Sequence, residues 1–554
     1  MLRIAGLEIS ILNFLIFAPM VAGLICLLLP KNKQVVRWAA LLMSIGIGIA
    51  SLYAFYGYNP QAAGFQLVSV GRFFPLLGSS FHLGIDGISA AMVLLTGLLT
   101  PLAVLISFEQ EDRVNTHMAL LLFFQGPLFG VFIAQDLLIF FLFYELSLVP
   151  MYFLINQWGG PNRRYASTKF FIYSLGGSLG MLLAIQLIGW SVSTISPDVV
   201  ETLRTSNPAL AGYVPGSPSF NIPVLTALWP ELSGSFLGIN AETVKALAFV
   251  GFFVAFAIKV PVWPFHTWLP DAHSEAPTAG SMLLAGIMLK LGAYGFLRLV
   301  IPLFPDVWIE PINLLGFQTN WAGIFAFLAM MGIVLGAFAA WGQNDIKRLV
   351  AYSSVNHMGF VALGLAVTAV AYGQLYRDGT TEHLQDAILA TNGAVLQMFS
   401  HGLSSAAMFL LAGAIYHKTH TRDMTQYGGL WVKAPIFGGI FIFSSMASLG
   451  LPGLAGFASE FLVVRGSWAV FTWLTLISML GLLITGNYIL KGIRATLHGP
   501  FNLRWRNTNL EIELREAVAI APLMALLLIT GLVPNWILSV INESVTRMLV
   551  VFGG

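Results

Sequence analysis

The sequence predicts an all-α polytopic membrane protein, and three features support that fold class. Only 9% of the 554 residues are charged, whereas a soluble globular protein has roughly 25%. Hydrophobic residues make up 57% of the chain, and the mean hydropathy is +0.81. Apolar runs of about 20 residues, the length that crosses a hydrocarbon core, recur along the whole chain. We therefore expect about 14 transmembrane helices.

The expected spans are separated by charged residues, glycines and prolines, and each lasts about 17 to 29 residues. The first run is too long for the core of a signal peptide and no small-residue cleavage site follows it, so we expect a retained span. The spans begin near Ile11, Val36, Gly87, His117, Leu137, Ser167, Val244, Thr278, Trp321, Ile346, Ile388, Ile436, Trp468 and Ala517.

Basic residues concentrate in the loops that follow odd-numbered spans, such as the loop with Lys347 and Arg348. Since positively charged loops stay in the cytoplasm, these loops should be cytoplasmic and both termini should lie on the other side. Two long non-cytoplasmic stretches, from Tyr58 to Asp86 and from Ser193 to about Glu242, are expected to form ordered caps or partner-facing loops.

The seventh and twelfth spans are each interrupted by proline, in KVPVWPFH from Lys259 to His266 and in LPGLAG from Leu451 to Gly456. Interrupted segments in corresponding halves are typical of inverted-repeat transporters with a functional centre near the midplane. We therefore expect two inverted five-helix repeats. The chain divides into 1–116 (spans 1 to 3 and an outer loop), 117–302 (first repeat, spans 4 to 8), 303–492 (second repeat, spans 9 to 13) and 493–554 (cytoplasmic loop and last span).

Composition and motifs exclude several functions. The net charge of +2, from 27 basic and 25 acidic residues, is too balanced for a nucleic-acid surface. The single cysteine, Cys26, excludes a disulfide framework, a thiolate zinc site and an iron-sulfur cluster held wholly by this chain. The sequence has no Walker A loop, dinucleotide fingerprint, nucleophile elbow or histidine pair suited to haem. The chemistry left for this chain is the movement of ions.

Four ionisable residues, Glu145, Lys259, Lys290 and Glu460, lie within expected spans. A charge at the centre of a spanning helix costs at least about 2.5 to 3.5 kcal/mol on insertion scales, so each is a candidate functional residue. Glu145 lies about 13 Å beyond Asp136, close to the middle of a core of about 30 Å. Asp136 itself is expected to cap the N-terminus of the helix.

Three of these residues also have a structural interpretation. A protonated Glu145 or an interhelical hydrogen bond of Glu460 would stabilise packing without transport. Lys259 directly precedes a proline break, where an ammonium could bind carbonyls that have lost their donors. Lys290 lies about 18 Å from the start of its helix, so its side chain cannot easily reach the interface and no cheap structural role is evident.

Histidines lie between these positions, namely His266, His357 and His401. Histidine titrates near neutral pH and can relay protons through water, but an intramembrane histidine is also a common packing residue. No two of the three stand at i, i+4 on one helix, so their spacing does not support a metal site.

The stretch KVPVWPFHTWLPDAHSEAPTAGSMLLAGIMLKLGAYGFLRL, from Lys259 to Leu299, resembles the signature of the antiporter-like, proton-pumping membrane subunits of respiratory complex I. Supporting stretches are FFLFYELSLVPMYFL, NDIKRLVAYSSVNHMGF, FSHGLSSAAMFLLAG and LPGLAGFASEFL. The chain is most similar to the M type, which corresponds to mitochondrial subunit 4 and cyanobacterial chain 4. The segment around Lys290 is M-like, and we expect no long lateral helix of the L type.

This resemblance implies a proton channel in which four buried residues transfer protons. Glu145 would modulate Lys259, the switchable lysine of the first half-channel, and Lys290 would link the two halves. Glu460 would be the exit residue. The histidines that would line the water path are His266, His357 and His401.

The resemblance also implies an assembly. The chain would belong to the membrane arm of an NAD(P)H:quinone oxidoreductase, with L-, N- and K-like membrane subunits as neighbours and a peripheral redox arm. No cofactor is expected on this chain, whereas FMN, iron-sulfur clusters and quinone would be bound by other subunits. The membrane would be a bacterial plasma membrane, or a thylakoid membrane in a cyanobacterium.

Three other functions compete with this one. The first is a subunit of an Mrp-type cation/proton antiporter, whose D-type chains resemble this sequence in the same places. The second is the membrane arm of a ferredoxin- or hydrogenase-linked relative. The third is a non-transporting scaffold, which would have little reason to keep four mid-membrane ionisable residues.

Overall fold

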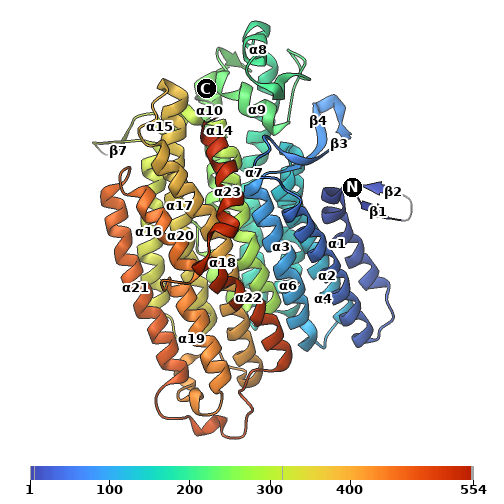
Figure 1. Cartoon of the computed structure of the whole chain (residues 1–554), viewed down its shortest axis with the longest axis vertical. Helices are drawn as coiled ribbons and strands as arrows, with labels where there is room; N and C mark the ends of the chain where they lie inside the picture. Colours follow the sequence, from blue (N-terminus) through green and yellow to red (C-terminus); the bar gives the residue numbers. More distant parts are fainter. Residues whose placement is uncertain (1, 5–6, 315, 551–554) are drawn as a thin grey trace.

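A computed structural model describes residues 2–4, 7–314 and 316–550 as a bundle of long helices that run roughly side by side (Figure 1). In this described part, 13 spans are long and apolar enough to cross a membrane. They are formed by α1 (Ile11–Leu28), α2 (Lys33–Tyr56), α3 (Gly87–Ile106), α4 (Val114–Ile133), α5 (Leu137–Leu146) continued by α6 (Leu148–Trp158), α7 (Arg163–Ser191), α10 (Ala241–Lys259), α12 (Thr278–Leu283) continued through α13 (Leu289–Gly295) to α14 (Ile301–Leu303), α16 (Trp321–Trp341), α17 (Ile346–Asp378), α18 (Leu384–Thr419), α21 (Thr472–Leu497) and α22 (Leu514–Leu532).

The predicted all-α polytopic class is confirmed, and the twelfth expected span accounts for the difference between 14 and 13. It is present as two short helices, α19 (Pro435–Leu449) and α20 (Ala455–Ser467), on either side of the expected break. The seventh expected span is broken in the same manner. There α10 ends at Lys259 and α11 (Trp268–Glu275) follows after the proline-containing segment. The division of the chain into two repeats and two flanking segments stays a prediction.

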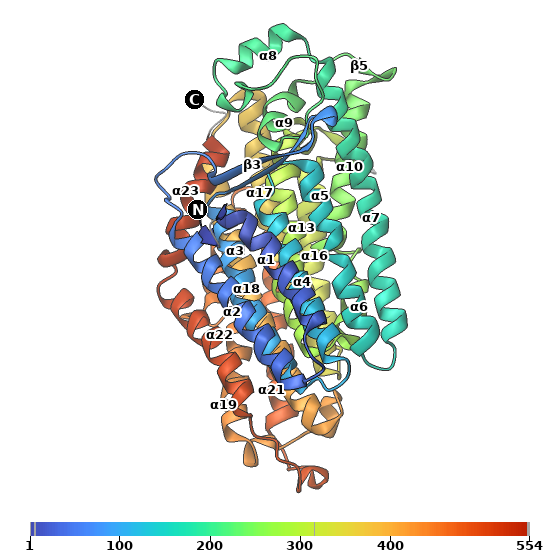
Figure 2. The ribbon, with the colours of Figure 1, turned by 90° about the vertical axis from the view of Figure 1, so that its right-hand side faces the viewer.

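The two stretches expected to be ordered caps both contain regular structure at one end of the bundle (Figure 2). In the first, β3 (Gln66–Phe74) pairs antiparallel with β4 (Ser79–Ile85). The second contains α8 (Pro197–Arg204) and α9 (Ile222–Leu228). Three smaller hairpins and one short helix complete the loops: β1 (Leu2–Ile4) with β2 (Leu7–Ile9), β5 (Ser235–Phe236) with β6 (Ile239–Asn240), β7 (Ile312–Leu314) with β8 (Phe317–Thr319), and α15 (Pro305–Ile309).

Asp136 caps α5, as the sequence predicts, because its carboxylate accepts hydrogen bonds from the backbone N–H groups of Leu138 and Ile139 at 3.0 and 3.3 Å. The same carboxylate also accepts from the Ser79 hydroxyl at 2.9 Å and from the Ser80 N–H at 3.0 Å. One side chain therefore fixes both the start of a spanning helix and the strand that covers it.

A final helix that the sequence analysis does not separate from the last span is present in the structure. The chain leaves α22 at Leu532 and forms α23 (Asn535–Val550) after a proline. Every fourth residue of α23 is buried, at Ile537, Ile541, Val545 and Leu549. This stripe packs against α3 and α18. The helix returns the chain toward the end of the bundle where α1 begins (Figure 1).

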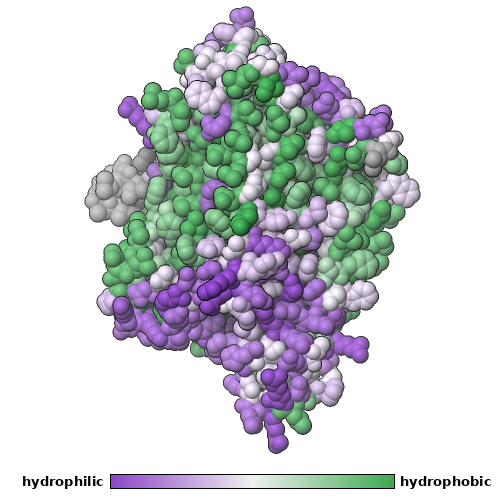
Figure 3. All heavy atoms as spheres, turned by 180° about the vertical axis from the view of Figure 1, so that it is seen from behind, coloured by the Kyte–Doolittle hydropathy of each residue, from purple (hydrophilic) through white to green (hydrophobic). Residues whose placement is uncertain are grey.

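The surface has a broad apolar band and a strongly hydrophilic end (Figure 3), as expected for an integral membrane protein. Ion pairs hold several loops and helix ends together, including Lys169 with Asp271 at 2.7 Å. The exposed Glu111 accepts hydrogen bonds from Lys33 at 2.6 Å and from Arg37 at 2.5 Å. These bonds lower the pKa of the Glu111 carboxyl to about 2.

The core of the bundle is formed by the spans at Thr278–Leu303, Ile346–Asp378 and Leu384–Thr419, which are almost completely buried. These helices therefore have almost no surface left for lipid, and polar side chains on them face other protein groups. Lys290, His357 and His401 all lie on these three helices.

Candidate proton-transfer site

Lys290 lies between two π-helical turns, η6 (Leu284–Met288) and η7 (Phe296–Val300), of the span that carries it. The lysine is fully buried. Its Nζ donates to the Ala285 carbonyl at 2.5 Å and lies 2.8 Å from Nδ1 of His401. Ala285 belongs to the first π turn, where the wider winding can leave a carbonyl without its usual helical donor. Local helix geometry thus gives the buried ammonium one of its two partners.

His401 connects Lys290 to the other half of the site. Its second ring nitrogen, Nε2, lies 3.2 Å from the Ser354 hydroxyl of α17. Its ring centroid is 5.7 Å from that of His357, also on α17. An imidazole that accepts a proton on one nitrogen can release one from the other. His401 is therefore placed to pass protons between a lysine and a neighbouring histidine.

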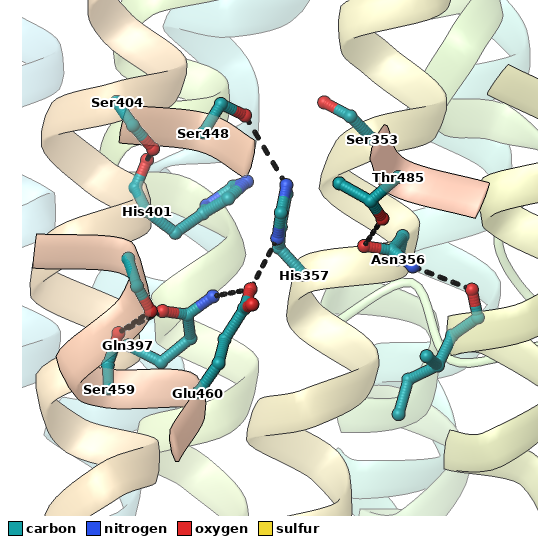
Figure 4. A network of polar contacts seen from close by, with 12 residues as sticks. Ser353, Asn356, His357, Gln397, His401, Ser404, Ser448, Ser459, Glu460 and Thr485 are labelled. Carbon is teal, nitrogen blue, oxygen red and sulfur yellow. Dashed lines mark hydrogen bonds and ion pairs between the residues drawn. The ribbon is translucent and has the colours of Figure 1, made fainter. Parts of the chain in front are cut away.

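His357 forms a buried pair with Glu460 (Figure 4), in which its Nδ1 lies 2.7 Å from the carboxylate Oε1. The other nitrogen, Nε2, faces the hydroxyls of Ser448 at 3.3 Å and Tyr488 at 3.5 Å. Both side chains of the pair are almost completely buried, at 3% and 5% exposed. The pair lies where α17 meets α20, the second half of the broken span.

Gln397, one turn before His401 on α18, supports Glu460 and was not among the predicted site residues. Its Nε2 donates to the same Glu460 oxygen at 2.9 Å, and Ser459 donates to its Oε1 (Figure 4). The signal for it was present in the sequence, because it is a polar amide in the apolar run AVLQMF four residues before His401. The structure thus adds a residue that orients the predicted exit carboxylate.

Lys259 ends α10 with its Nζ buried and without a hydrogen-bond acceptor among the residues that the structure describes. The ammonium instead lies over the ring of Tyr144, 4.5 Å from its centroid. Carbonyls next to the break have other donors, since Trp268 Nε1 donates to Ile258 at 2.9 Å and Tyr144 donates to Ala255 at 3.3 Å. In this conformation Lys259 does not have the carbonyl-capping role that was the structural alternative.

Glu145 lies at the end of α5, next to the residue that joins α5 to α6. It is half-buried, and its Oε1 is buried without a hydrogen-bond partner in the described part of the chain. The ion pairs within 4.0 Å among the described residues do not include Glu145 with Lys259, and neither Glu145 Oε1 nor Lys259 Nζ has a hydrogen-bond partner there. An unpaired charge away from water is costly, so a movement that brings the two side chains together would stabilise both charges.

The structure therefore brings four of the seven predicted residues into one connected series, which runs Lys290, His401, His357 and Glu460. It does not join Glu145, Lys259 and His266 to that series by direct hydrogen bonds. His266 is half-buried in the segment after Lys259, and its ring meets Tyr352 edge to face at 6.3 Å between centroids.

Comparisons with known proteins show the family of this chain. A family model described as "NADH:quinone oxidoreductase/Mrp antiporter, TM" matches residues 134–485. The chain belongs to this family. The matched segment contains all seven predicted site residues, from Glu145 to Glu460.

Within this antiporter family, the similar proteins include M-type and chain 4 subunits. The NADH-quinone oxidoreductase subunit M of Rhodobacter capsulatus is 35% identical over 545 residues, which cover 98% of this chain and 96% of that protein. The NAD(P)H-quinone oxidoreductase chain 4 1 of Synechococcus elongatus is 36% identical over 545 residues, covering 97% and 91%. A chain in the structure of respiratory complex I from Thermus thermophilus with bound NADH has a TM-score of 0.75 and 26% identity, covering 97% and 99%.

This member of the antiporter family also buries titratable groups that the sequence analysis did not single out. His273 is fully buried on α11 and stacks on Phe409 with ring centroids 4.4 Å apart. Neither ring nitrogen of His273 has a hydrogen-bond partner in the described structure. Lys347, at the start of α17, is also buried and donates to the Ala276 carbonyl at 2.9 Å. The sequence places both at the ends of spans, where such residues are usually solvated, and so carries no signal for their burial.

In the described residues of this antiporter-family chain, no group of three or more His, Cys, Asp and Glu side chains is arranged to hold a metal ion. The site offers acids and bases instead, held by hydrogen bonds in the buried interior of the bundle. Such an arrangement can accept, hold and pass on protons.

Proposed function

We propose that this chain is the M-type, proton-translocating membrane subunit of an NAD(P)H:quinone oxidoreductase, and that protons pass through Lys290, His401, His357 and Glu460. The observation that carries the proposal is the series of these four buried groups, of which Lys290, His401 and His357 lie on three almost completely buried spans and Glu460 lies on α20. Insertion of ionisable groups at this depth is expensive, which favours a transport role over a packing role. Family membership, with relatives matched over nearly their full length, supports the same conclusion.

Transfer would begin at Lys290, whose ammonium can donate to Nδ1 of His401 along a contact of 2.8 Å. His401 would then release a proton from its other nitrogen, toward Ser354 and His357. The two rings, whose centroids lie 5.7 Å apart, are not joined by a direct hydrogen bond in the described structure, so a water between them would carry the proton. His357 would pass the proton to Glu460, from which it leaves the membrane.

The first half-channel would act as the switch. If Glu145 and Lys259 moved into contact, the carboxylate would stabilise the protonated Lys259. If they moved apart, Lys259 would release its proton more easily. A hydrogen bond to a charged group contributes about 1.5 to 3 kcal/mol, and moving one proton against 100 mV requires about 2.3 kcal/mol. One rearrangement of this pair is therefore of the size that pumping one proton requires.

The rest of the assembly follows from the same proposal. The chain would lie among L-, N- and K-like membrane subunits, and quinone reduction elsewhere in the complex would supply the energy. FMN and iron-sulfur clusters would reside in other subunits. The basic loops would face the cytoplasm, with both termini on the opposite side. Residues 117–302 and 303–492 would form the two inverted repeats.

The proposal is tested by replacing Lys290 with methionine in the intact complex. Lys290→Met keeps the volume of the side chain but cannot carry a proton, so pumping should stop while the complex still assembles. Lys433→Met, at an exposed lysine outside the site, is the matched control and should pump normally. Proton uptake by proteoliposomes during NADH oxidation measures the result. Normal proton translocation by an assembled Lys290→Met complex would exclude the proposed path.

Membership in a redox complex is tested separately, by purifying the tagged chain in a gentle detergent and identifying the bound proteins by mass spectrometry. Flavin and iron-sulfur subunits should copurify, and the donor-binding subunit would identify the electron source. If only other hydrophobic antiporter chains copurify, the chain belongs to a cation/proton antiporter instead.

A further inference from the structure

A basic groove lies on the outer surface where α16 ends beside α21, away from the proton-transfer site. It has a volume of about 660 Å³, and its lining includes Trp341, Asn487, Leu490, Lys491, Arg494 and His498. None of the lining residues, all of which lie in the described part of the chain, is acidic. The basic groove therefore presents only neutral and positively charged groups.

The two cations of the basic groove have different surroundings. Lys491 donates to the Trp341 carbonyl at 2.8 Å and to the Gln343 carbonyl at 2.7 Å, so it satisfies the C-terminal end of α16. Arg494 is exposed. Within the described structure its guanidinium has no hydrogen-bond or ion-pair partner among the contacts formed by side chains. Its planar fork of donors is free to bind an anion, and a phosphate is a good geometric match.

The depth of Arg494 along α21 places it at the level of lipid headgroups. The helix begins at Thr472, and at 1.5 Å per residue Arg494 lies about 33 Å further on, just beyond a hydrocarbon core of about 30 Å. Exposed tryptophans mark both levels, with Trp473 75% exposed near the start of α21 and Trp341 47% exposed in the groove. Tryptophan at both ends of a span is typical of the two membrane interfaces.

The same face of α21 continues from the groove into an exposed apolar stripe. Leu490, Leu483 and Leu480 are 56%, 70% and 51% exposed. Residues three or four positions apart, or multiples of these, lie on one face of a helix, so these leucines follow one another below Arg494. The basic groove at headgroup level matches the phosphate headgroup of a phospholipid, and the apolar stripe below it matches the acyl chains.

We propose that the basic groove binds the phosphate of an anionic phospholipid, whose acyl chains lie along the leucine stripe of α21. The end of the bundle with the groove is the one predicted to face the cytoplasm, where the leaflet is rich in anionic lipids. The lipid would fix α16 and α21 against each other at the rim of the second half-channel. This site is independent of the proton path, so either proposal can fail without the other.

The first experiment measures lipid retention by the intact complex after detergent exchange and addition of phosphatidylglycerol or phosphatidylcholine. The unchanged complex should retain phosphatidylglycerol in preference to phosphatidylcholine. Arg494→Gln should weaken that retention about fivefold, the effect expected for one cation near a membrane surface. Arg506→Gln removes an exposed arginine of the same end that does not line the groove, and should leave retention unchanged. Equal retention by both variants would overturn the proposal.

A second experiment keeps Arg494 in place and so does not depend on how its variants fold. A photoreactive amino acid at position 490 should form an adduct with a phospholipid when the complex is irradiated in membranes. Inorganic phosphate in excess should not reduce that adduct, because the acyl chains contribute to binding. An adduct with a neighbouring protein subunit would instead identify this face as a subunit interface and refute the lipid site.

Discussion

Replacing Glu460 with glutamine would separate the charge of the predicted exit residue from its hydrogen bonds. The carboxylate Oε1 accepts from His357 at 2.7 Å and from Gln397 at 2.9 Å. A glutamine amide oxygen can accept both bonds in the same place, so the geometry should be retained. What the variant loses is the negative charge that stabilises a protonated His357 and the ability to carry a proton.

The size of the effect follows from the two hydrogen bonds. A hydrogen bond to a charged group contributes about 1.5 to 3 kcal/mol, and a neutral one about 0.5 to 1.5 kcal/mol. Losing the charge at two such bonds removes about 2 to 3 kcal/mol. Since about 1.4 kcal/mol corresponds to a factor of ten, transfer from His357 should slow by about 30- to 150-fold. Pumping should fall by that factor or stop.

The assay reconstitutes the intact complex in proteoliposomes and records NADH oxidation together with acidification of the lumen by a pH-sensitive dye. Glu382→Gln, at an exposed loop glutamate, is the matched control and should behave as the unchanged complex. Glu460→Ala is a harsher comparison, since it also leaves His357 and Gln397 without their acceptor and should lower the unfolding temperature. If assembled Glu460→Gln complex pumps as many protons per NADH as the unchanged complex, the role given to Glu460 is refuted.

Three further predictions concern a close glycine contact, a buried ion pair and the titration of an exposed carboxyl. Gly292→Ala should lower the free energy of unfolding by about 1 to 3 kcal/mol, because a Cβ there would lie 2.9 Å from the Lys259 Cβ. Gly176→Ala is the control, since a Cβ at position 176 meets open space, and thermal unfolding should find that variant as stable as the unchanged protein. Lys418→Met should lower the free energy of unfolding by about 3 to 5 kcal/mol, because its partner Glu516, 2.7 Å away and 4% exposed, is left as a buried, unpaired charge. The amount of assembled complex should therefore fall, and the double variant Lys418→Met with Glu516→Gln should recover much of it. For Glu111, whose pKa is lowered from 4.5 to about 2, the stabilising contribution of its ion pairs should be complete above pH 4.5 and fade as the pH falls toward 2; an infrared titration that finds the carboxyl protonated at pH 4 would contradict this.

The sequence was sufficient for the features that depend on one segment at a time. The prolines in the seventh and twelfth expected spans predicted both helix breaks, because a helix interior cannot satisfy the carbonyls that a proline leaves without donors. The cost of a buried charge singled out Lys290 and Glu460. The apolar residue at every fourth position of α23, from Ile537 to Leu549, was also present in the sequence. The sequence did not separate α23 from α22, because the apolar run of the last span continues into α23 and only Pro534 marks the boundary between the two helices.

The contacts between the site residues depend on packing between distant segments and could not be read from the sequence. His357 and Glu460 are 103 positions apart, and Lys290 and His401 are 111 apart. Their meeting requires α13, α17, α18 and α20 to pack together in one register, which no local pattern specifies. The same reason explains why the burial of His273, next to an aromatic ring of α18, was not predicted.

The two halves of the site differ in how well their charges are satisfied, and this difference bears on where energy enters. Lys290, His357 and Glu460 each have close polar partners. Lys259 and the Glu145 oxygen Oε1 have none within hydrogen-bond distance in the described structure. An unsatisfied pair gains the most free energy from a small movement, whereas a satisfied series gains little. A conformational signal from elsewhere in the complex should therefore act first on the Glu145 and Lys259 pair, and the series from Lys290 to Glu460 should respond to it.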